Sequence, residues 1–201
     1  MAELSASHFN LYLAPHFFDA GECARLLAAL RPSPTTQAPV YIEGADRFVH
    51  EDVRRTTSLH PADEIFSVVH SRLCEEKPAL EKHFGLTLTD CERPQFLRYQ
   101  TGDFFVRHQD GNTEQLQFDH LRIRRISLIV FLNEHTVQPQ ADSFSGGSLN
   151  FYDLNEAGPD GPTAFPLFGE TGLLVAFTAE TMHEVAPVTN GERFTVISWF
   201  R

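Results

Sequence analysis

The sequence predicts an α+β fold, with helices in the first half and a β-barrel of the jelly-roll kind in the second. The segments whose apolar residues fall at helical spacing lie in the first half of the chain. From Pro94 onward, short runs rich in β-branched and aromatic residues alternate with turn signals such as TGD, SGG and GPDGP. Eighteen phenylalanines favour strands and a well-filled apolar interior.

Two helical stretches are predicted. The first begins after Asp19, which suits the N-cap position, and Pro32 and Pro34 end it. Its apolar residues at helical spacing are Cys23, Leu26, Leu27 and Leu30. The second covers residues 61–84, and Pro78 is expected to break or bend it. Its predicted apolar face consists of Ile65, Val68, Val69 and Leu73.

Seven short strands are predicted after Pro94, a number and spacing typical of a sandwich or barrel. They are 96–99, 104–108, 126–132, 148–152, 172–177, 184–188 and 194–200. The polar, irregular segments 35–58, 111–122 and 135–146 are predicted loops that choose the substrate and are mobile in its absence.

The bulk properties indicate one intracellular domain of 201 residues. No apolar run approaches the roughly 18 residues that span a bilayer, and we expect no signal peptide from the first residues. Cys23, Cys74 and Cys91 are widely spaced and show no CxxC pairing, so we expect neither a disulfide framework nor a structural zinc site. A reducing, cytoplasmic compartment is the simplest interpretation.

The net charge of −11 argues against a general phosphate-binding surface. The one basic cluster, Arg122, Arg124 and Arg125, is short and alternates with apolar residues. It is therefore predicted to be a strand edge or part of a ligand pocket rather than a nucleic-acid patch. We expect no nucleic-acid or membrane partner, and the oligomeric state is not readable from the sequence.

The most informative candidate for a functional site is His108-Gln109-Asp110, followed far downstream by His183 and Arg193. Two imidazoles and a carboxylate are the ligand set that holds a non-haem Fe(II) by one face. Residues two apart in a strand share a face, so His108 and Asp110 can present ligands from one strand end. His183 begins another predicted strand. Ordinary interior or surface histidines remain the alternative on spacing alone.

Two longer stretches carry a resemblance to a known family. Residues 99–110, YQTGDFFVRHQD, resemble the Y-x-x-G-x-x-F-x-x-H-x-D signature of prolyl 4-hydroxylase-like Fe(II)/2-oxoglutarate oxygenases. Residues 183–200, HEVAPVTNGERFTVISWF, resemble the closing H-x-V-x-P-V-x-x-G-x-R pattern and the Trp-bearing strand of that family. RRISLIVFLN, GGSLNFYD, the first helix and VRRTTSL also match. The resemblance therefore spans nearly the whole chain.

The resemblance implies a double-stranded β-helix (jelly-roll) core at 91–201 within a single domain at 1–201. Residues 1–90 would form a helical support region whose helices pack on one sheet. His108, Asp110 and His183 would be the catalytic Fe(II) ligands. Arg193 would clamp the distal carboxylate of 2-oxoglutarate bidentately, while the 2-keto acid end of that co-substrate chelates the iron.

Further co-substrate contacts are implied for Tyr99, whose alternative role is that of a core tyrosine, and for Thr195, which shares a strand face with Arg193. The chain also departs from some relatives, because Phe131 stands where they have a tyrosine that bonds the distal carboxylate. Ser127, on the same strand face, is predicted to compensate in part. Trp199 is expected to pack the pocket wall rather than to touch the substrate.

The activity that the resemblance implies is hydroxylation of an unactivated C–H bond, with O2 as a further co-substrate, succinate and CO2 as products and ascorbate as a candidate reductant. A prolyl residue of a protein or peptide is the first expected substrate, and a free amino acid or other small metabolite is the alternative. Nucleic-acid demethylation is disfavoured because Trp199 stands where those relatives carry a second arginine. A non-catalytic metal- and 2-oxoglutarate-binding sensor module is the alternative from a different class.

Overall fold

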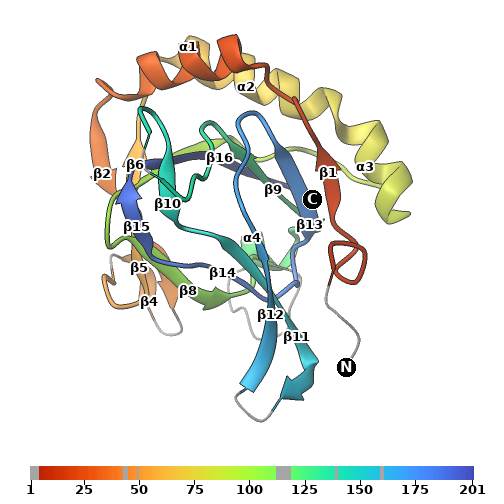
Figure 1. Ribbon diagram of the computed structural model, residues 1–201. Helices are drawn as coiled ribbons and strands as arrows, with labels where there is room; N and C mark the ends of the chain where they lie inside the picture. The colour runs from red at the N-terminus through yellow and green to blue at the C-terminus, as the bar shows by residue number, and fades with distance from the viewer. Residues whose placement is uncertain (1–4, 43–44, 49, 112–118, 139, 159–160) are drawn as a thin grey trace.

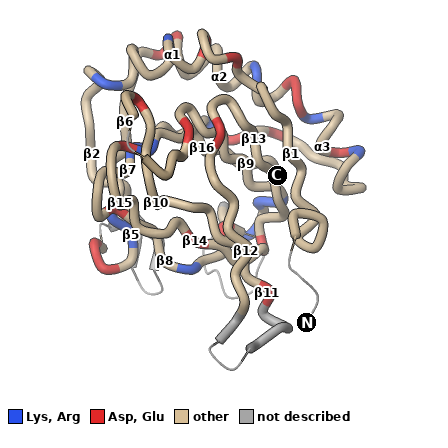
Figure 2. Tube along the Cα trace, in the orientation of Figure 1, with Lys and Arg blue, Asp and Glu red and all other residues tan. Residues whose placement is uncertain are grey.

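The computed structural model describes residues 5–42, 45–48, 50–111, 119–138, 140–158 and 161–201 (Figure 1). Two antiparallel sheets enclose an apolar interior, and three helices lie along the outer side of the larger sheet. Acidic and basic residues are interspersed along these helices rather than gathered in one basic stripe (Figure 2). Among the described helices, none has the length and apolar character needed to cross a membrane.

The larger sheet has the strand order β1-β13-β9-β16-β7-β6-β2, with every neighbouring pair antiparallel. Its strands are β1 (Tyr12–Ala14), β13 (Leu174–Thr178), β9 (Ile126–Phe131), β16 (Arg193–Phe200), β7 (Gln95–Tyr99), β6 (Thr57–Leu59) and β2 (Thr35–Gln37).

The smaller sheet has the order β12-β11-β14-β8-β5 and is also antiparallel. Its strands are β12 (Gly161–Leu167), β11 (Leu149–Gly158), β14 (His183–Val185), β8 (Phe104–His108) and β5 (Arg54–Arg55). Two short pairs complete the strands of the described chain: β10 (Phe144–Gly146) with β15 (Val188–Gly191), and β3 (Val40–Ile42) with β4 (Ala45–Phe48).

Local sequence signals mark the start of α1 and the break between α2 and α3. At α1 (Ala20–Leu30), the Asp19 side chain accepts from Glu22 N and the Glu22 side chain accepts from Asp19 N, a capping box. The second predicted stretch is two helices, α2 (Asp63–Glu75) and α3 (Lys77–Phe84), because Pro78 cannot continue the α2 hydrogen-bond ladder and instead occupies the first turn of α3. A four-residue helix, α4 (Asp119–Arg122), precedes β9.

Alternation along β16 divides the core into two layers. Phe194, Val196 and Phe200 join a cluster that includes the buried apolar residues of α1, α2 and α3. Arg193, Thr195 and Trp199 have the opposite parity and face the space between the sheets, since side chains alternate across a strand. The helices thus cover one face of the larger sheet, and its other face is left for the site.

Several sequence predictions were wrong in detail. Residues 35–58 are not an irregular loop: β2, β5 and β6 belong to the two sheets. These strands are two or three residues long, and β2 is exposed along its length, so they show no apolar alternation; pairing with neighbouring strands defines them. The region 1–90 is therefore not only helical. Val68 is 63% exposed and is not part of the apolar face of α2.

The predicted strand at 184–188 is divided into β14 and β15, separated by Ala186-Pro187, because proline lacks the N–H that the strand ladder needs. Most of the predicted loop 111–122 lies outside the described residues, and its end forms α4. The predicted loop 135–146 includes β10. The mobility of these segments remains a prediction.

Candidate metal and co-substrate site

Three side chains with metal-ligating atoms meet at the edge where β8 and β14 pair. His108 ends β8, His183 begins β14, and the two are cross-strand partners. Asp110 follows directly and is fixed by its backbone, because the N–H groups of Asp110 and Gly111 both donate to Ala179 O at 2.9 and 3.1 Å. One ligand atom from each of the three lies within 4.8 Å of the others. The structure therefore brings together the three residues that the sequence singled out as ligands.

Both imidazoles present the same nitrogen to Asp110. His108 Nδ1 lies 2.8 Å from Val106 O, and His183 Nδ1 lies 2.9 Å from Thr181 O. Because a carbonyl can only accept, each Nδ1 carries a proton, which leaves Nε2 with the lone pair in a neutral ring. The Nε2 atoms lie 3.5 and 3.7 Å from the two carboxylate oxygens of Asp110. The hydrogen bond from Nδ1 to a backbone carbonyl is the usual way in which a metal-ligating histidine is oriented.

The electrostatics of the cluster favour neutral imidazole beside an ionised carboxylate. Burial, with a contribution from His108, lowers the pKa of His183 to about 4. Burial opposes the ionisation of Asp110, but His183, His108 and Arg124 outweigh it and hold the pKa of Asp110 below its ordinary value. Neutral imidazole and carboxylate are the forms that bind a metal ion.

Neighbouring side chains hold the cluster in place. Ser127 Oγ donates to Asp110 Oδ2 at 2.7 Å. The Phe105 ring stacks on the His108 ring with centroids 3.6 Å apart and an interplanar angle of 18°. Ser127 was predicted as a co-substrate contact that compensates for Phe131. In the structure its hydroxyl instead donates to the Asp110 carboxylate, and it lies at the opposite end of β9 from Phe131.

Arg193 is a buried cation with unsatisfied donors. It is 1% exposed, and its Nε and Nη2 have no hydrogen-bond partner, nor does the neighbouring Thr195 Oγ1. The guanidinium lies over the rings of Tyr99 and Phe131, at 5.1 and 4.8 Å from their centroids. Burial lowers the pKa of Arg193 to about 10, so the side chain remains charged at neutral pH. A carboxylate could accept hydrogen bonds from these two guanidinium nitrogens and from the Thr195 hydroxyl.

A cavity of about 290 Å³ lies beside the cluster of His108, Asp110 and His183. Its walls include His108, Asp110, His183, Tyr99 and Trp199. The prediction that Trp199 packs the pocket wall is thus confirmed. Arg193, Thr195 and Ser127 are not among the wall residues of this cavity. Of these three, Arg193 and Thr195 lie deeper on β16, on the same strand face as Trp199.

The wall of the cavity contains a part-buried ion pair, and the sequence predicted only one of its two members. Arg124 Nε and Nη2 donate to the two carboxylate oxygens of Glu92 at 2.9 and 2.7 Å, and the guanidinium stacks 3.5 Å above the Trp199 ring centroid. Arg124 was predicted as a possible pocket element, and it lines the cavity. Glu92 was missed because no local pattern links it to an arginine 32 residues later.

The residues present fit Fe(II) and a dicarboxylate. Two imidazole nitrogens and a carboxylate lie within 4.8 Å of one another on the wall of the cavity, and they are the donor set of a facial triad. The unpaired donors of Arg193 and Thr195 suit a carboxylate that enters from the metal side.

Comparison with known proteins agrees with this chemistry. A family model described as the 2OG-Fe(II) oxygenase superfamily matches residues 94–201. A PKHD-type hydroxylase of Cupriavidus pinatubonensis is 31% identical over 109 residues, which cover 54% of this chain and 42% of that protein. The match thus spans less than half of the relative's own length.

Two solved structures share the fold. A Pseudomonas putida prolyl-4-hydroxylase has a TM-score of 0.69 and 24% identity, covering 98% of this chain and 94% of the other. A prolyl hydroxylase of Trichoplax adhaerens, in complex with a peptide fragment of hypoxia inducible factor, has a TM-score of 0.71 and 13% identity, covering 97% and 84%. This likeness confirms the predicted double-stranded β-helix core.

Proposed function

This chain belongs to the 2OG-Fe(II) oxygenase superfamily, and we propose that it hydroxylates an unactivated C–H bond, with a prolyl residue of a protein or peptide as substrate. Fe(II), 2-oxoglutarate and O2 would take part, with succinate and CO2 as the further products. The observation that carries the proposal is the presence of two features in the interior between the two sheets, one on each sheet. These are the His108, Asp110 and His183 cluster, and the unpaired buried donors of Arg193 and Thr195.

The roles of the residues follow from their positions. His108, Asp110 and His183 would hold the iron, and Ser127 and Phe105 keep two of these ligands in orientation. Arg193 and Thr195 would bind the distal carboxylate of 2-oxoglutarate. Tyr99, which lines the cavity and lies beside the Arg193 guanidinium, would flank the same co-substrate. Bound iron with 2-oxoglutarate and O2 supplies the oxidising power.

The shape of the cavity favours a substrate that inserts one small group. Its volume of about 290 Å³ lies at the lower end of the roughly 300–1,000 Å³ typical of ligand pockets. Because the co-substrate occupies part of that space, the remainder suits a single ring or short side chain whose parent chain stays outside. A prolyl residue in a peptide has this form, and prolyl hydroxylases among the structural neighbours support the choice.

The substrate wall would consist of Trp199, Arg124 and Glu92, so we propose that Trp199 touches the substrate, contrary to the expectation from the sequence. The Arg124 guanidinium is held flat on the indole by its two hydrogen bonds to Glu92. A rigid wall of this kind orients an inserted ring without needing its own rearrangement. The polar edges of the ion pair offer a donor and an acceptor at the mouth, where peptide amides would pass.

A library screen tests the proposal. The protein is incubated with Fe(II), 2-oxoglutarate and O2 against prolyl peptides, free amino acids and small metabolites. Mass spectrometry reports the gain of one oxygen, and succinate is measured in parallel. We expect a prolyl peptide to be oxidised with equimolar succinate, and neither product from His108→Ala. Oxidation of a small metabolite with no prolyl peptide modified would contradict the substrate assignment. Turnover retained in His108→Ala would contradict the site.

A further inference from the structure

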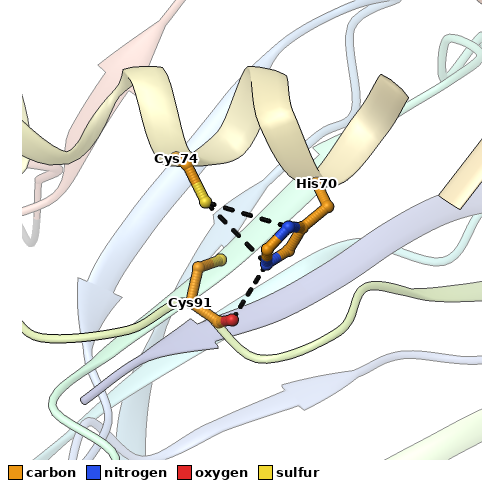
Figure 3. Close-up of side chains that lie close together, drawn as sticks. All are labelled: His70, Cys74 and Cys91. Carbon is orange, nitrogen blue, oxygen red and sulfur yellow. Dashed lines mark hydrogen bonds between the residues drawn. The ribbon is translucent and has the colours of Figure 1, made fainter. Parts of the chain in front are cut away.

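A second cluster of metal-ligating side chains lies on the other face of β16, away from the cavity. His70 and Cys74 come from α2, and Cys91 comes from the segment just before β7 (Figure 3). One ligand atom from each lies within 4.8 Å of the others. The absence of CxxC pairing had argued against a zinc site, yet the fold brings together residues 17 positions apart that no local motif connects.

We propose that His70, Cys74 and Cys91 form a binding site for a thiophilic divalent ion such as Zn²⁺, separate from the iron site. Imidazole and two thiolates are donors that select Zn²⁺ over the oxygen-seeking Mg²⁺ and Ca²⁺. A solvent molecule would complete the tetrahedron from the exposed side, where Cys74 lies.

The spacing of the donor atoms is close to that of a tetrahedral site. With Zn–S bonds of about 2.3 Å and Zn–N bonds of about 2.0 Å, neighbouring ligand atoms in a tetrahedron are roughly 3.5 to 3.8 Å apart. Cys74 Sγ lies 4.0 Å from His70 Nδ1, the ring nitrogen that would bind the ion. Since no separation in the cluster exceeds 4.8 Å, side-chain movements of about 1 Å are enough to close it.

The local structure orients the ligands before any ion binds. His70 and Cys74 are four residues apart on one helix and therefore share a face. His70 Nε2 lies 3.0 Å from Cys91 O, and because a carbonyl only accepts, Nε2 carries the proton in this arrangement. The neutral ring then has its lone pair on Nδ1. A ring N–H donated to a backbone carbonyl is the usual support of a metal-ligating histidine.

The position of Cys91 links this cluster to the back of the substrate wall. Cys91 Sγ lies 3.3 Å from Ser198 Oγ, and that hydroxyl donates to Glu92 O at 2.6 Å. Ser198 and Trp199 are adjacent on β16 and point to opposite faces. An ion bound here would therefore fasten α2 to the segment that carries Glu92, without entering the cavity.

Cobalt substitution tests the site without relying on activity. Co(II) is titrated anaerobically into the reduced, metal-stripped protein, and the near-ultraviolet thiolate-to-metal charge-transfer band is recorded. The iron site contains only nitrogen and oxygen donors, so the band reports the cysteine cluster alone. Because the His108, Asp110 and His183 site also takes up Co(II), we expect the band to be complete by two added equivalents and to correspond to one bound Co(II) per protein. X-ray absorption of the zinc form should show sulfur at about 2.3 Å.

A cysteine variant in the cluster and a control cysteine variant outside it test the proposed ligands. Cys74→Ser should abolish the band and weaken Zn²⁺ binding by more than the roughly 10- to 100-fold that loss of an outer-sphere partner causes. Cys74 is exposed, so this variant should fold, which its unfolding midpoint checks. Cys23→Ala, on the buried face of α1, should keep the band.

His70→Gln separates metal binding from disulfide chemistry, because it retains both thiols and should still lower the affinity for the metal ion. A band that persists in Cys74→Ser would overturn the proposal. So would a reduced protein that shows no thiolate band but forms a Cys74–Cys91 disulfide on oxidation.

Discussion

Replacing Arg193 with methionine should stabilise the metal-free protein and remove most of its affinity for 2-oxoglutarate. The two effects have opposite signs because the guanidinium is buried with two unpartnered nitrogen atoms. In the free protein, the charge has lost its water without gaining a partner. In the loaded protein, the same atoms would hold a carboxylate.

The size of the first effect follows from the pKa. Burial lowers the pKa of Arg193 from 12.5 to about 10, and each unit is worth about 1.4 kcal/mol. The cost applies in full at neutral pH, since a base with a lowered pKa destabilises the fold at every pH below that pKa. The charged side chain thus costs roughly 3 kcal/mol. Lost stacking on Tyr99 and Phe131, about 1 kcal/mol each, leaves a net gain of roughly 1 kcal/mol.

The second effect is larger. Hydrogen bonds to a charged group contribute about 1.5–3 kcal/mol each, so losing two raises the Kd for 2-oxoglutarate by roughly 100-fold or more. Thermal unfolding of the metal-free protein measures the first effect, and thermal unfolding with redox-inert Mn(II) in the metal site measures the second. At 2-oxoglutarate concentrations near 100 times Kd, the natural protein should gain about 2.7 kcal/mol. The variant should gain less than about 0.5 kcal/mol at the same concentration.

Arg98→Met is the matched control. Arg98 is a half-buried arginine on β7 whose Nε also lacks a partner, and its Nη1 lies 3.5 Å from Glu192. Its removal should leave 2-oxoglutarate affinity unchanged. The reasoning is refuted if Arg193→Met binds 2-oxoglutarate within about threefold of the natural protein, or if the metal-free variant is less stable by several kcal/mol.

Three further outcomes are expected. Ser127→Ala removes the hydrogen bond to Asp110 and should weaken Mn(II) binding by roughly 10- to 100-fold, measured by titration; unchanged affinity would contradict the orienting role. Glu92→Ala leaves the buried Arg124 charge without its main partner and should lower the free energy of unfolding by about 3 kcal/mol, measured by urea denaturation. Gly172→Ala places a Cβ 1.9 Å from the backbone oxygen of Phe18, at a φ of +78°. It should therefore lower the unfolding midpoint more than Glu92→Ala does. A variant as stable as the natural protein would show that the backbone around Phe18 moves aside at little cost.

The features that the sequence predicted well are those encoded locally. Asp19 and Glu22 specify the start of α1, and Pro78 specifies the break between α2 and α3. Each acts within one helical turn. The predicted ligands His108 and Asp110 are likewise two residues apart, with His108 at the end of β8 and Asp110 just after it.

What escaped prediction depends on contacts between distant segments. The short strands β2, β5 and β6 exist because longer neighbours pair with them, and their own residues show no strand pattern. The partner of Ser127 could not be foreseen, since Asp110 lies in the segment after β8, which belongs to the other sheet. The same reason hid Glu92 and the approach of Cys91 to α2.

The most direct test of the iron and 2-oxoglutarate site is an anaerobic titration of the natural protein with Fe(II) and then 2-oxoglutarate. A site formed by His108, Asp110 and His183, with Arg193 behind it, should give a visible metal-to-ligand charge-transfer band that saturates at one equivalent. The band should be absent in His183→Ala. A folded natural protein that develops no band, or a band unchanged in His183→Ala, would contradict the account.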